Sequence, residues 1–260
     1  MISVVIPAFN EETLLPRCLT SIKNQTYTGS FEIVVSNNAS TDATAQVATT
    51  LGARVVHCPL RGVAHARQVG AEAAEGDIIV QADADTVYPP YWLARIATYF
   101  ENHPHSVAVS GGYYYEDPPR WARFEYITRY FVNMVSLLLL GRPVIISGAN
   151  FAFRRNTFLR TDGYEPNTLY PDQWGISHSL SRHGKVAFDR ALLVATSARR
   201  VQRPAHTLLK DTALNLARII RHFCKYVADS KRPIVKQHRL KIKRAVSIFL
   251  LAITWPSRLI

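Results

Sequence analysis

The sequence predicts an α/β fold, a doubly wound and mainly parallel sheet (Rossmann-like) that is followed by a basic helical extension. Two observations favour this fold class. Short apolar segments rich in β-branched residues alternate with segments whose apolar residues recur at helical spacing, and a polar loop follows the early strands. The composition, 48% hydrophobic and 19% charged over 260 residues, is typical of a folded chain with a large core.

The first half of the chain has four predicted strands with helices between them. We expect strands at residues 2–6, 31–35, 54–57 and 77–82, and helices at 14–22, from 43 onward and at 62–74. Ser40 or Thr41 can cap the helix that begins near Ala43. In such sheets ligands bind beyond the carboxyl ends of the strands, so we expect the loops at residues 7–12, 36–42 and 83–85 to meet at one crevice.

The second half has a less regular pattern. We expect a strand at residues 107–115, a helix within 119–140, a turn entering a strand at 147–155, a turn at 161–164, and a helix from Asp172 to Gly184. The chain divides into a domain of residues 1–200 and a basic, amphipathic helical tail of residues 201–260.

Two carboxylates, Asp83 and Asp85, follow the apolar strand at residues 77–82 directly. In an extended chain residues i and i+2 point the same way, so both side chains can face one pocket at the end of the strand. Mg²⁺ or Mn²⁺ takes one or two protein carboxylates and completes its shell with water and phosphate oxygens. The pair therefore predicts a metal that arrives with a nucleotide, and a polar turn without a ligand is the alternative.

The excess positive charge is confined to the end of the chain. Residues 1–198 hold 16 Lys and Arg against 17 Asp and Glu, whereas residues 199–260 hold 15 against 2. A basic groove for nucleic acid would spread its cations through the domain, so no nucleic-acid partner is expected. The three widely spaced cysteines fit a reducing compartment, and residues 1–6 lack the basic segment of a signal peptide, so we expect a cytoplasmic protein.

Several segments, in their order along the chain, resemble the inverting family 2 glycosyltransferases of GT-A fold. They are VVIPAFNEE, SNNASTDAT, GVAHARQVGAEAAEGDIIVQADADTVYPP, SGANFAFRR, the Asp162-Gly163-Tyr164 turn and an acid at a helix start before SRHGKV. The resemblance implies a nucleotide-diphosphosugar donor, first of all a UDP-sugar, and a divalent metal. It also implies transfer with inversion to a sugar, lipid-linked or other hydroxyl acceptor, in the synthesis of a cell-envelope polysaccharide, glycolipid or lipid-linked glycan. The nucleotide-sugar half would be residues 1–115 and the acceptor half residues 116–200.

The resemblance also implies roles for individual residues. The implied donor contacts are Pro7, Ala8, Asn10, Glu11, Asn37, Arg67 and Asp83, and the implied metal ligand is Asp85, with Asp83 in its outer shell. Glu11 would accept from ribose hydroxyls, although the helix dipole alone also favours an acid before a helix. Arg67 would reach the base or the diphosphate, or else belong to a solvated helix face. Asn37 stands where the family commonly has an acid, and its amide can accept from uracil N3–H without requiring it.

Inversion requires a base on the face opposite the leaving group, and Asp172 is the predicted base. The family usually shows Glu-Asp at this point, whereas this chain reads Tyr170-Pro171-Asp172, so the register stays open by one residue. Asp172 can also serve as the N-cap of the helix that follows it. Trp174 can form an apolar wall for the sugar or pack in the core.

The tail is predicted to bind an anionic membrane surface through residues 231–255. Seven Lys and Arg without an acid lie between Lys231 and Arg244, and an apolar run from Ala245 to Trp255 follows at once. That run is about half of the roughly 20 residues that a helix needs to cross a bilayer, so we expect it to lie on the cytoplasmic face as a peripheral anchor. A helix packed on the domain or on a second subunit is the alternative.

Two other functions stay open. A nucleotidyltransferase would share the sheet and the carboxylate-bound metal, but residues 7–12 lack the Gly-rich, basic phosphate loop that is usual there. The other is a basic module that binds nucleic acid or a membrane surface and whose enzyme-like half is inactive, although the presence of Asp83, Asp85 and Asp172 argues against inactivity.

Overall fold

The computed structural model describes residues 1–119, 122–143, 145–164 and 172–202. Within them, eight strands form one sheet in the order β3-β2-β1-β4-β7-β6-β8-β5. The strands are β1 (Ile2–Ala8), β2 (Phe31–Asn37), β3 (Arg54–His57), β4 (Ile78–Gln81), β5 (Thr86–Val87), β6 (Ser106–Glu116), β7 (Phe151–Arg154) and β8 (Lys185–Ser197). The helices are α1 (Leu15–Lys23), α2 (Thr44–Thr50), α3 (Val63–Ala73), α4 (Trp92–Asn102), α5 (Ala122–Leu140), α6 (Arg155–Phe158) and α7 (Asp172–Ser181), and η1 (Ala198–Arg200) is a 3₁₀ helix.

The sheet is mainly parallel, as the sequence predicts. Strands β1, β2, β3 and β4 are parallel, β6 and β8 run in the same direction as these four, and β7 and β5 run in the opposite direction. The antiparallel β7 lies between β4 and β6, where Phe151 pairs with Gln81 and with Ser110. The carboxyl ends of six strands therefore meet at the same edge as the amino end of β7.

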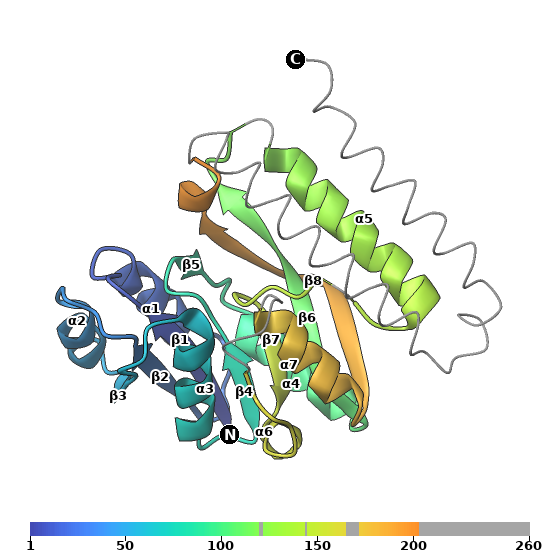
Figure 1. Ribbon diagram of the computed structural model, residues 1–260, viewed down its shortest axis with the longest axis horizontal. Coiled ribbons are helices and arrows are strands. Elements are labelled where there is room, and N and C mark those ends of the chain that lie inside the picture. Colours follow the sequence, from blue (N-terminus) through green and yellow to red (C-terminus); the bar gives the residue numbers. More distant parts are fainter. Residues whose placement is uncertain (120–121, 144, 165–171, 203–260) are drawn as a thin grey trace.

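Helices cover both faces of the sheet, and successive buried residues of its strands point to opposite faces. Val4 belongs to a core that includes residues of α1, α2 and α4, whereas its neighbour Val5 belongs to a second core with residues of α3, α6 and α7. Both valines are fully buried, which explains the continuous apolar run of β1. Figure 1 shows α3 and α7 over one face of the sheet and α5 alongside the long strands β6 and β8.

The carboxylate of Glu32 ties together the amino edge of the sheet. It accepts hydrogen bonds from Ser3 Oγ at 2.6 Å, the Glu75 backbone N–H at 2.8 Å and the Arg54 guanidinium at 2.6 Å. Burial raises the pKa of Glu32, but these hydrogen bonds and the charge of Arg54 outweigh it, so the pKa lies below the ordinary 4.5. The ionised carboxylate therefore stabilises the folded chain.

Some sequence expectations need correction. The short strand β5, the helix α4 and the long strand β8 were not predicted, and α7 ends at Ser181 rather than at Gly184. Neither Ser40 nor Thr41 caps α2, because its cap position is Ala43, which makes no side-chain hydrogen bond. Instead Asp42 Oδ1 accepts from the Thr44 backbone N–H at 3.0 Å. The tail beyond residue 202, including 231–255, lies outside the described residues.

The helix α5 has an apolar stripe that faces solvent. Phe131, Val135 and Leu138 recur at helical spacing, and they are 66%, 37% and 81% exposed. None of the helices in the described ranges is both long and apolar enough to cross a bilayer.

Candidate active site

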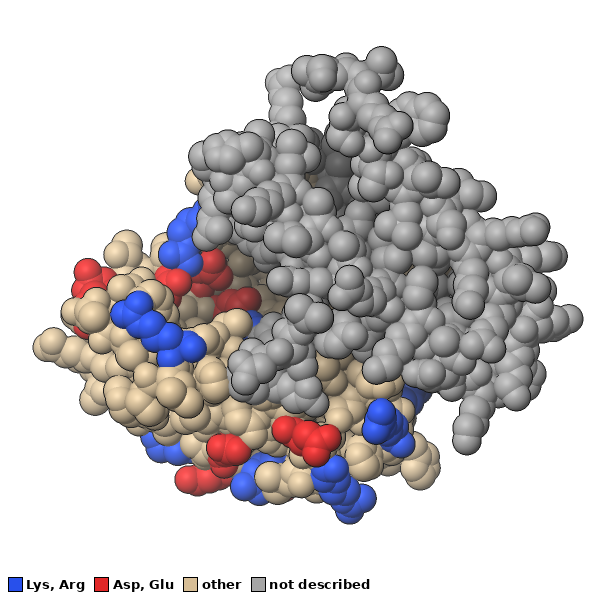
Figure 2. Space-filling model, in the orientation of Figure 1, with Lys and Arg blue, Asp and Glu red and all other residues tan. Residues whose placement is uncertain are grey.

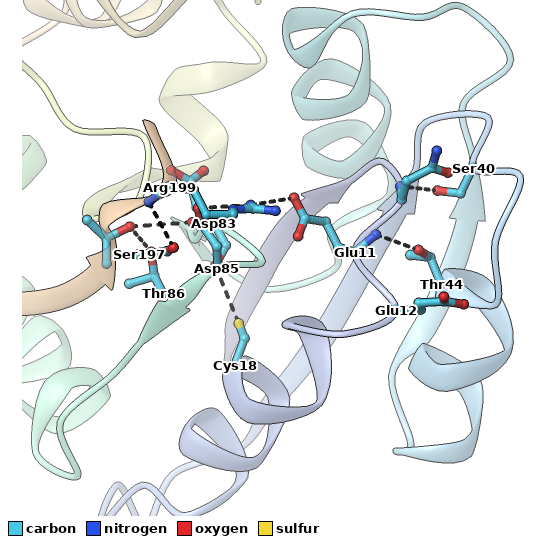
Figure 3. Close-up of polar contacts among 12 residues, drawn as sticks. Glu11, Glu12, Cys18, Ser40, Thr44, Asp83, Asp85, Thr86, Ser197 and Arg199 are labelled. Carbon is cyan, nitrogen blue, oxygen red and sulfur yellow. Dashed lines mark hydrogen bonds and ion pairs between the residues drawn. The ribbon is translucent and has the colours of Figure 1, made fainter. Parts of the chain in front are cut away.

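Two polar loops interlock at the carboxyl edge of the sheet, as predicted. The Asn10 backbone N–H donates to Ser40 Oγ at 3.1 Å, and Asn10 Oδ1 accepts from the Thr41 backbone N–H at 2.9 Å. The Glu11 backbone N–H donates to Thr44 Oγ1 at 2.8 Å (Figure 3). Asn10 has a φ of 53°, a left-handed conformation that Asn tolerates better than most residues. These contacts hold the loop after β1 against the start of α2.

The predicted pair Asp83 and Asp85 lies at this edge, but not for the predicted reason. The strand β4 ends at Gln81, and the Thr86 backbone N–H donates to the Asp83 carbonyl at 3.2 Å, which closes a turn over residues 83–86. The extended i, i+2 geometry therefore does not apply. Each carboxylate instead contacts a different arginine, Arg67 for Asp83 and Arg199 for Asp85.

Asp85 is held by residues at the end of β8. Its Oδ1 accepts from Thr196 Oγ1 at 3.4 Å, its Oδ2 accepts from Arg199 Nη2 at 3.1 Å, and its carbonyl accepts from the Ser197 backbone N–H at 3.1 Å. The side chain is 24% exposed. Asp85 is thus fixed from three points and still open to a ligand from solvent.

Glu11 faces Asp85 across the same arginine. The same Arg199 Nη2 donates to Glu11 Oε1 at 2.8 Å, so one nitrogen joins the two carboxylates (Figure 3). Glu11 Oε2 is buried without a hydrogen-bond partner among the described residues. Burial raises the pKa of Glu11, and the nearby charge of Asp85 adds to this rise, whereas Arg199 lowers it. An additional donor or cation at Oε2 would therefore be favourable.

Asp83 is anchored by a buried arginine. Arg67 Nη2 donates to Asp83 Oδ1 at 2.8 Å, and the Arg67 side chain is only 6% exposed. With the Gln173 amide turned so that its oxygen faces the guanidinium, that oxygen accepts from Arg67 Nε and Nη1, each at 2.9 Å. A Cβ at Gly148 would lie 2.0 Å from Arg67 Nη2, so a larger residue there would displace the guanidinium. The described contacts of Arg67 assign it to holding Asp83 and not to a solvated helix face.

The loop at residues 147–150 joins the two halves of the domain. Asn150 is fully buried, accepts from Trp92 Nε1 at 2.9 Å, and donates from Nδ2 to the carbonyls of Gly112 and Leu192, each at 2.8 Å. Tyr88 Oη accepts from the Asp83 backbone N–H at 2.9 Å and lies 3.1 Å from the Ala149 carbonyl. The backbone of Asp83 is therefore coupled to this loop.

The remaining predicted residues lie around the same edge. Pro7 and Ala8 end β1, and Asn37 ends β2, where its Oδ1 accepts from the Ser40 backbone N–H at 3.1 Å. Asp172 is the first residue of α7, and Trp174 is buried, which favours the core role for this indole. Cys18 is buried, and its thiol donates to the Asp83 carbonyl with an Sγ–O distance of 3.4 Å.

Four residues of the site were not predicted from the sequence as site residues: Asn150, Gln173, Thr196 and Arg199. Asn150 lies within the SGANFAFRR segment and Gln173 directly follows Asp172, so sequence reasoning could have singled out both. Thr196 and Arg199 lie at and just after the end of β8, outside the segments that carried a motif. Their partners Asp85 and Glu11 are more than 100 residues away along the chain.

A pocket lies on the other side of the 147–150 loop, between β6, α5 and β8. Its described lining residues are Gly111, Gly112, Tyr113, Arg129, Tyr130, Asn133, Ile145, Ser147, Phe188, Arg190 and Leu193. The Arg129 guanidinium lies 5.0 Å from the centre of the Tyr113 ring, and that of Arg190 lies 5.7 Å from the Tyr130 ring. This lining combines two cations with aromatic and aliphatic groups.

Comparison with known proteins identifies a matching family model and similar proteins. Residues 3–160 match the family model described as Glycosyl transferase family 2. The putative glycosyltransferase EpsH of Bacillus subtilis is 26% identical over 227 residues, which is 74% of this chain and 66% of that protein. The glucosyl-dolichyl phosphate glucuronosyltransferase of Haloferax volcanii is 31% identical over 124 residues, which is 44% of this chain and 38% of that protein.

A solved structure shares the fold. The mannosyltransferase PcManGT from Pyrobaculum calidifontis, in complex with GDP-Man and Mn²⁺, superposes with a TM-score of 0.70 at 22% identity and covers 94% of this chain and 69% of that one. This chain spans 66% and 38% of the lengths of the two curated relatives.

Proposed function

This chain belongs to glycosyl transferase family 2, and from that premise we propose that it transfers a sugar from a nucleotide-diphosphosugar to an acceptor hydroxyl with inversion, using Mg²⁺ or Mn²⁺. One observation carries the proposal. Three carboxylates lie in the segments that follow the carboxyl ends of β1 and β4, namely Glu11, Asp83 and Asp85, and ligands of such sheets bind at this edge. Figure 2 shows acidic side chains lining a hollow on this face, with basic side chains at its rim.

The residues at this edge fit a divalent cation. Asp85 is a partly exposed carboxylate and Glu11 Oε2 is a buried oxygen without a described partner, so hard oxygen ligands are present where a cation would be favourable. The described residues contain no group of three or more His, Cys, Asp or Glu that could hold a metal. Two carboxylates would therefore bind the metal weakly, and donor phosphates would complete its shell. Bound there, a metal would neutralise the charge that develops on the leaving nucleoside diphosphate.

The donor would lie along the loops after β1 and β2. We propose that Pro7, Ala8, Asn10 and Asn37 border the nucleoside, and that the unpartnered Glu11 Oε2 accepts a ribose hydroxyl or a metal-bound water. Arg67 would act indirectly, because its guanidinium orients Asp83 and is almost fully buried. A UDP-sugar is our first choice of donor, although PcManGT was solved with GDP-Man.

Asp172 is the proposed base. It would take the proton of the acceptor hydroxyl as the acceptor oxygen bonds to the anomeric carbon and the bond from that carbon to the diphosphate oxygen breaks. Asp172 is the first residue of α7. The next residue, Gln173, contacts Arg67, so the first turn of α7 is tied to Asp83.

The pocket between β6, α5 and β8 is the proposed acceptor site. Its lining includes Ser147, the neighbour in sequence of Gly148, which packs against Arg67. Its aromatic rings suit sugar faces, and its guanidinium groups suit a phosphate such as that of a lipid-linked acceptor. The Haloferax relative is named for a dolichyl phosphate substrate. The exposed apolar stripe on α5 and the basic residues 231–255 support our proposal that the protein works as a peripheral protein at an anionic membrane surface.

A donor screen tests this proposal. Purified full-length protein is incubated with uridine, guanosine and thymidine diphosphosugars and Mn²⁺, and release of the nucleoside diphosphate is measured with and without EDTA. We expect release from one donor class, its loss in EDTA, and its loss in Asp85→Asn with the fold intact. Asp77→Asn is the matched control, because Asp77 lies at the opposite edge of the sheet and pairs only with the Met1 amino group among the described residues.

Two outcomes would contradict the proposal. Undiminished release in EDTA would exclude the metal, and Asp85→Asn at the level of Asp77→Asn would exclude Asp85. A protein that instead joins a sugar phosphate to a nucleoside triphosphate and releases pyrophosphate would be the nucleotidyltransferase alternative.

A further inference from the structure

Arg199 occupies the place of a cation between Glu11 and Asp85. We infer that Arg199 is a built-in counter-cation of the donor site, which neutralises this carboxylate pair in the donor-free protein and moves to the donor's diphosphate when a divalent cation takes Asp85. The inference rests on the proposed function, since it needs a donor with a diphosphate and a metal that binds the carboxylates.

The contact geometry makes Arg199 and a metal compete. A single nitrogen, Nη2, lies 2.8 Å from Glu11 Oε1 and 3.1 Å from Asp85 Oδ2. A metal bound to Asp85 would need an oxygen of this carboxylate and would bring a second positive charge close to the guanidinium. Because like charges repel strongly at such short range, both cations cannot hold Asp85 at full strength.

The backbone of Arg199 is fixed, whereas its side chain is at the surface. The Arg199 backbone N–H donates to Ser197 Oγ at 3.2 Å, and the Ser197 N–H donates to the Asp85 carbonyl at 3.1 Å. The side chain of Arg199 is 50% exposed, so its guanidinium can turn about the side-chain bonds while η1 stays in place. The movement therefore needs no rearrangement of the sheet.

A guanidinium suits the diphosphate of the donor as well as it suits the two carboxylates. Its planar fork donates two parallel hydrogen bonds to phosphate oxygens, which an ammonium group does not do. When the metal and the diphosphate arrive together, the diphosphate supplies the negative charge that Arg199 loses on leaving Asp85. The exchange conserves ion pairing at each step and involves no covalent change.

Other arginines at this edge are placed for different tasks. Arg67 is buried and contacts Asp83 and Gln173. The Arg61 guanidinium lies over the ring of Phe9, which follows β1, and is 4.6 Å from the ring centre. Among these three, Arg199 is the one that is both exposed and in contact with Asp85.

Binding of Mn²⁺ alone shows whether Arg199 competes with the metal for Asp85 or only orients this carboxylate. Full-length wild type, Arg199→Gln, Arg199→Lys and Arg95→Gln are titrated with Mn²⁺, and free Mn²⁺ is measured by electron paramagnetic resonance. Arg95→Gln is the matched control, because Arg95 makes an equally direct ion pair with Asp189 at 2.6 Å, away from these carboxylates. Binding of pyrophosphate in saturating Mn²⁺ is then measured by calorimetry. Pyrophosphate is the probe because it requires no assumption about which nucleotide the donor carries.

We expect opposite shifts in the two experiments. Arg199→Gln should bind Mn²⁺ about threefold to tenfold more tightly, because the competing cation is gone, and should bind Mn²⁺-pyrophosphate about tenfold more weakly. Arg199→Lys should keep the wild-type affinity for Mn²⁺, since one nitrogen makes both contacts, but should lose much of the affinity for pyrophosphate. Arg95→Gln should match wild type in both.

Unchanged or weaker Mn²⁺ binding in Arg199→Gln would overturn the inference, since an arginine that only orients Asp85 gives that result. Tighter Mn²⁺ binding with unchanged pyrophosphate binding would overturn the inferred movement of Arg199 to the diphosphate. If wild type and all variants bind neither Mn²⁺ nor Mn²⁺-pyrophosphate, the proposed function itself is contradicted, and this inference fails with it.

Discussion

Gly148 offers a direct test of how Asp83 is held. A Cβ at this position would lie 2.0 Å from Arg67 Nη2, 2.6 Å from Arg67 Cζ and 3.0 Å from Gln173 Nε2. Real Cβ atoms do not approach other atoms so closely, so Gly148→Ala must displace the guanidinium or the loop. Either movement separates Arg67 from Asp83, whose oxygen is 2.8 Å away.

The magnitude follows from the burial of the pair. Overpacking costs about 1–3 kcal/mol, and separating a buried charge from its partner costs about 3–5 kcal/mol. Asp83 is 34% exposed and can be rehydrated, whereas Arg67 is 6% exposed and cannot, so we expect the variant to lose about 2–3 kcal/mol of unfolding free energy. At about 2–4 °C per kcal/mol in a domain of this size, the melting temperature should fall by roughly 4–12 °C.

Gly175→Ala is the matched control, because the chemical change is the same and the expected sign is opposite. Gly175 lies within α7, and nothing lies within 4 Å of the Cβ it would gain. Alanine in a helix is favoured over glycine by about 0.5–1 kcal/mol, so this variant should be as stable as wild type or more stable. Thermal unfolding followed by circular dichroism measures both variants, and calorimetry with Mn²⁺ and the donor measures binding.

One result would refute this reasoning. Suppose that Gly148→Ala has the melting temperature of wild type and binds the donor equally well. Then the loop at 147–150 moves without a loss of unfolding free energy, and Arg67 does not hold Asp83 rigidly. A fall in stability in both glycine variants would point instead to a general sensitivity of this region.

Three further predictions concern the base, the pH dependence and the tail. Asp172→Asn should lower turnover by roughly two to four powers of ten while donor affinity persists, and a parallel loss of both would exclude Asp172 as the base and make Glu165 the next acid to test. Glu32→Gln should cost about 1–2 kcal/mol near neutral pH. Because the pKa of Glu32 is depressed in the fold, its contribution is present above 4.5 and is lost as the pH falls through the lower folded value, so urea titrations of the two proteins should converge in acid. Truncation after Asp229 should abolish sedimentation with anionic vesicles, and equal binding by both chains, or binding indifferent to salt, would count against the membrane proposal.

The fold was predictable where each strand is a short run of buried, β-branched residues. The strands β1, β2, β3 and β4 were found within two residues at their ends for this reason. The long strand β8 was missed because Asp189 and Arg190 interrupt its apolar residues, and the sheet has a register irregularity between β6 and β8 at this point. Its pattern is neither a continuous apolar run nor a regular alternation.

The candidate site was predictable as far as local patterns reach. Asp83 and Asp85 follow a strand, and the Asn10–Glu11 loop follows another, so both were found from the chain alone. The partner of Asp85 could not be found in this way, because Arg199 lies 114 residues further along the chain. The pairing depends on β5, a strand of two residues in which Thr86 is opposite Thr196. Nothing in a two-residue strand distinguishes it from a loop in the sequence.

The two antiparallel strands explain why distant residues meet at these carboxylates. In a fully parallel sheet, the segment before a strand arrives at the amino edge, away from the ligand site. Because β7 runs against β4, the segment before β7 arrives at the carboxyl edge, and Phe151 pairs with Gln81 at the end of β4. Residues 147–150 therefore lie beside Asp83. The strand β8 runs in the same direction as β4, so its end already lies at the carboxyl edge. The reversed strand β5 pairs with that end and so sets Arg199 against the turn after β4. The reversed strands β7 and β5 thus bring residues 147–150 and Arg199 to Asp83 and Asp85 from distant parts of the chain.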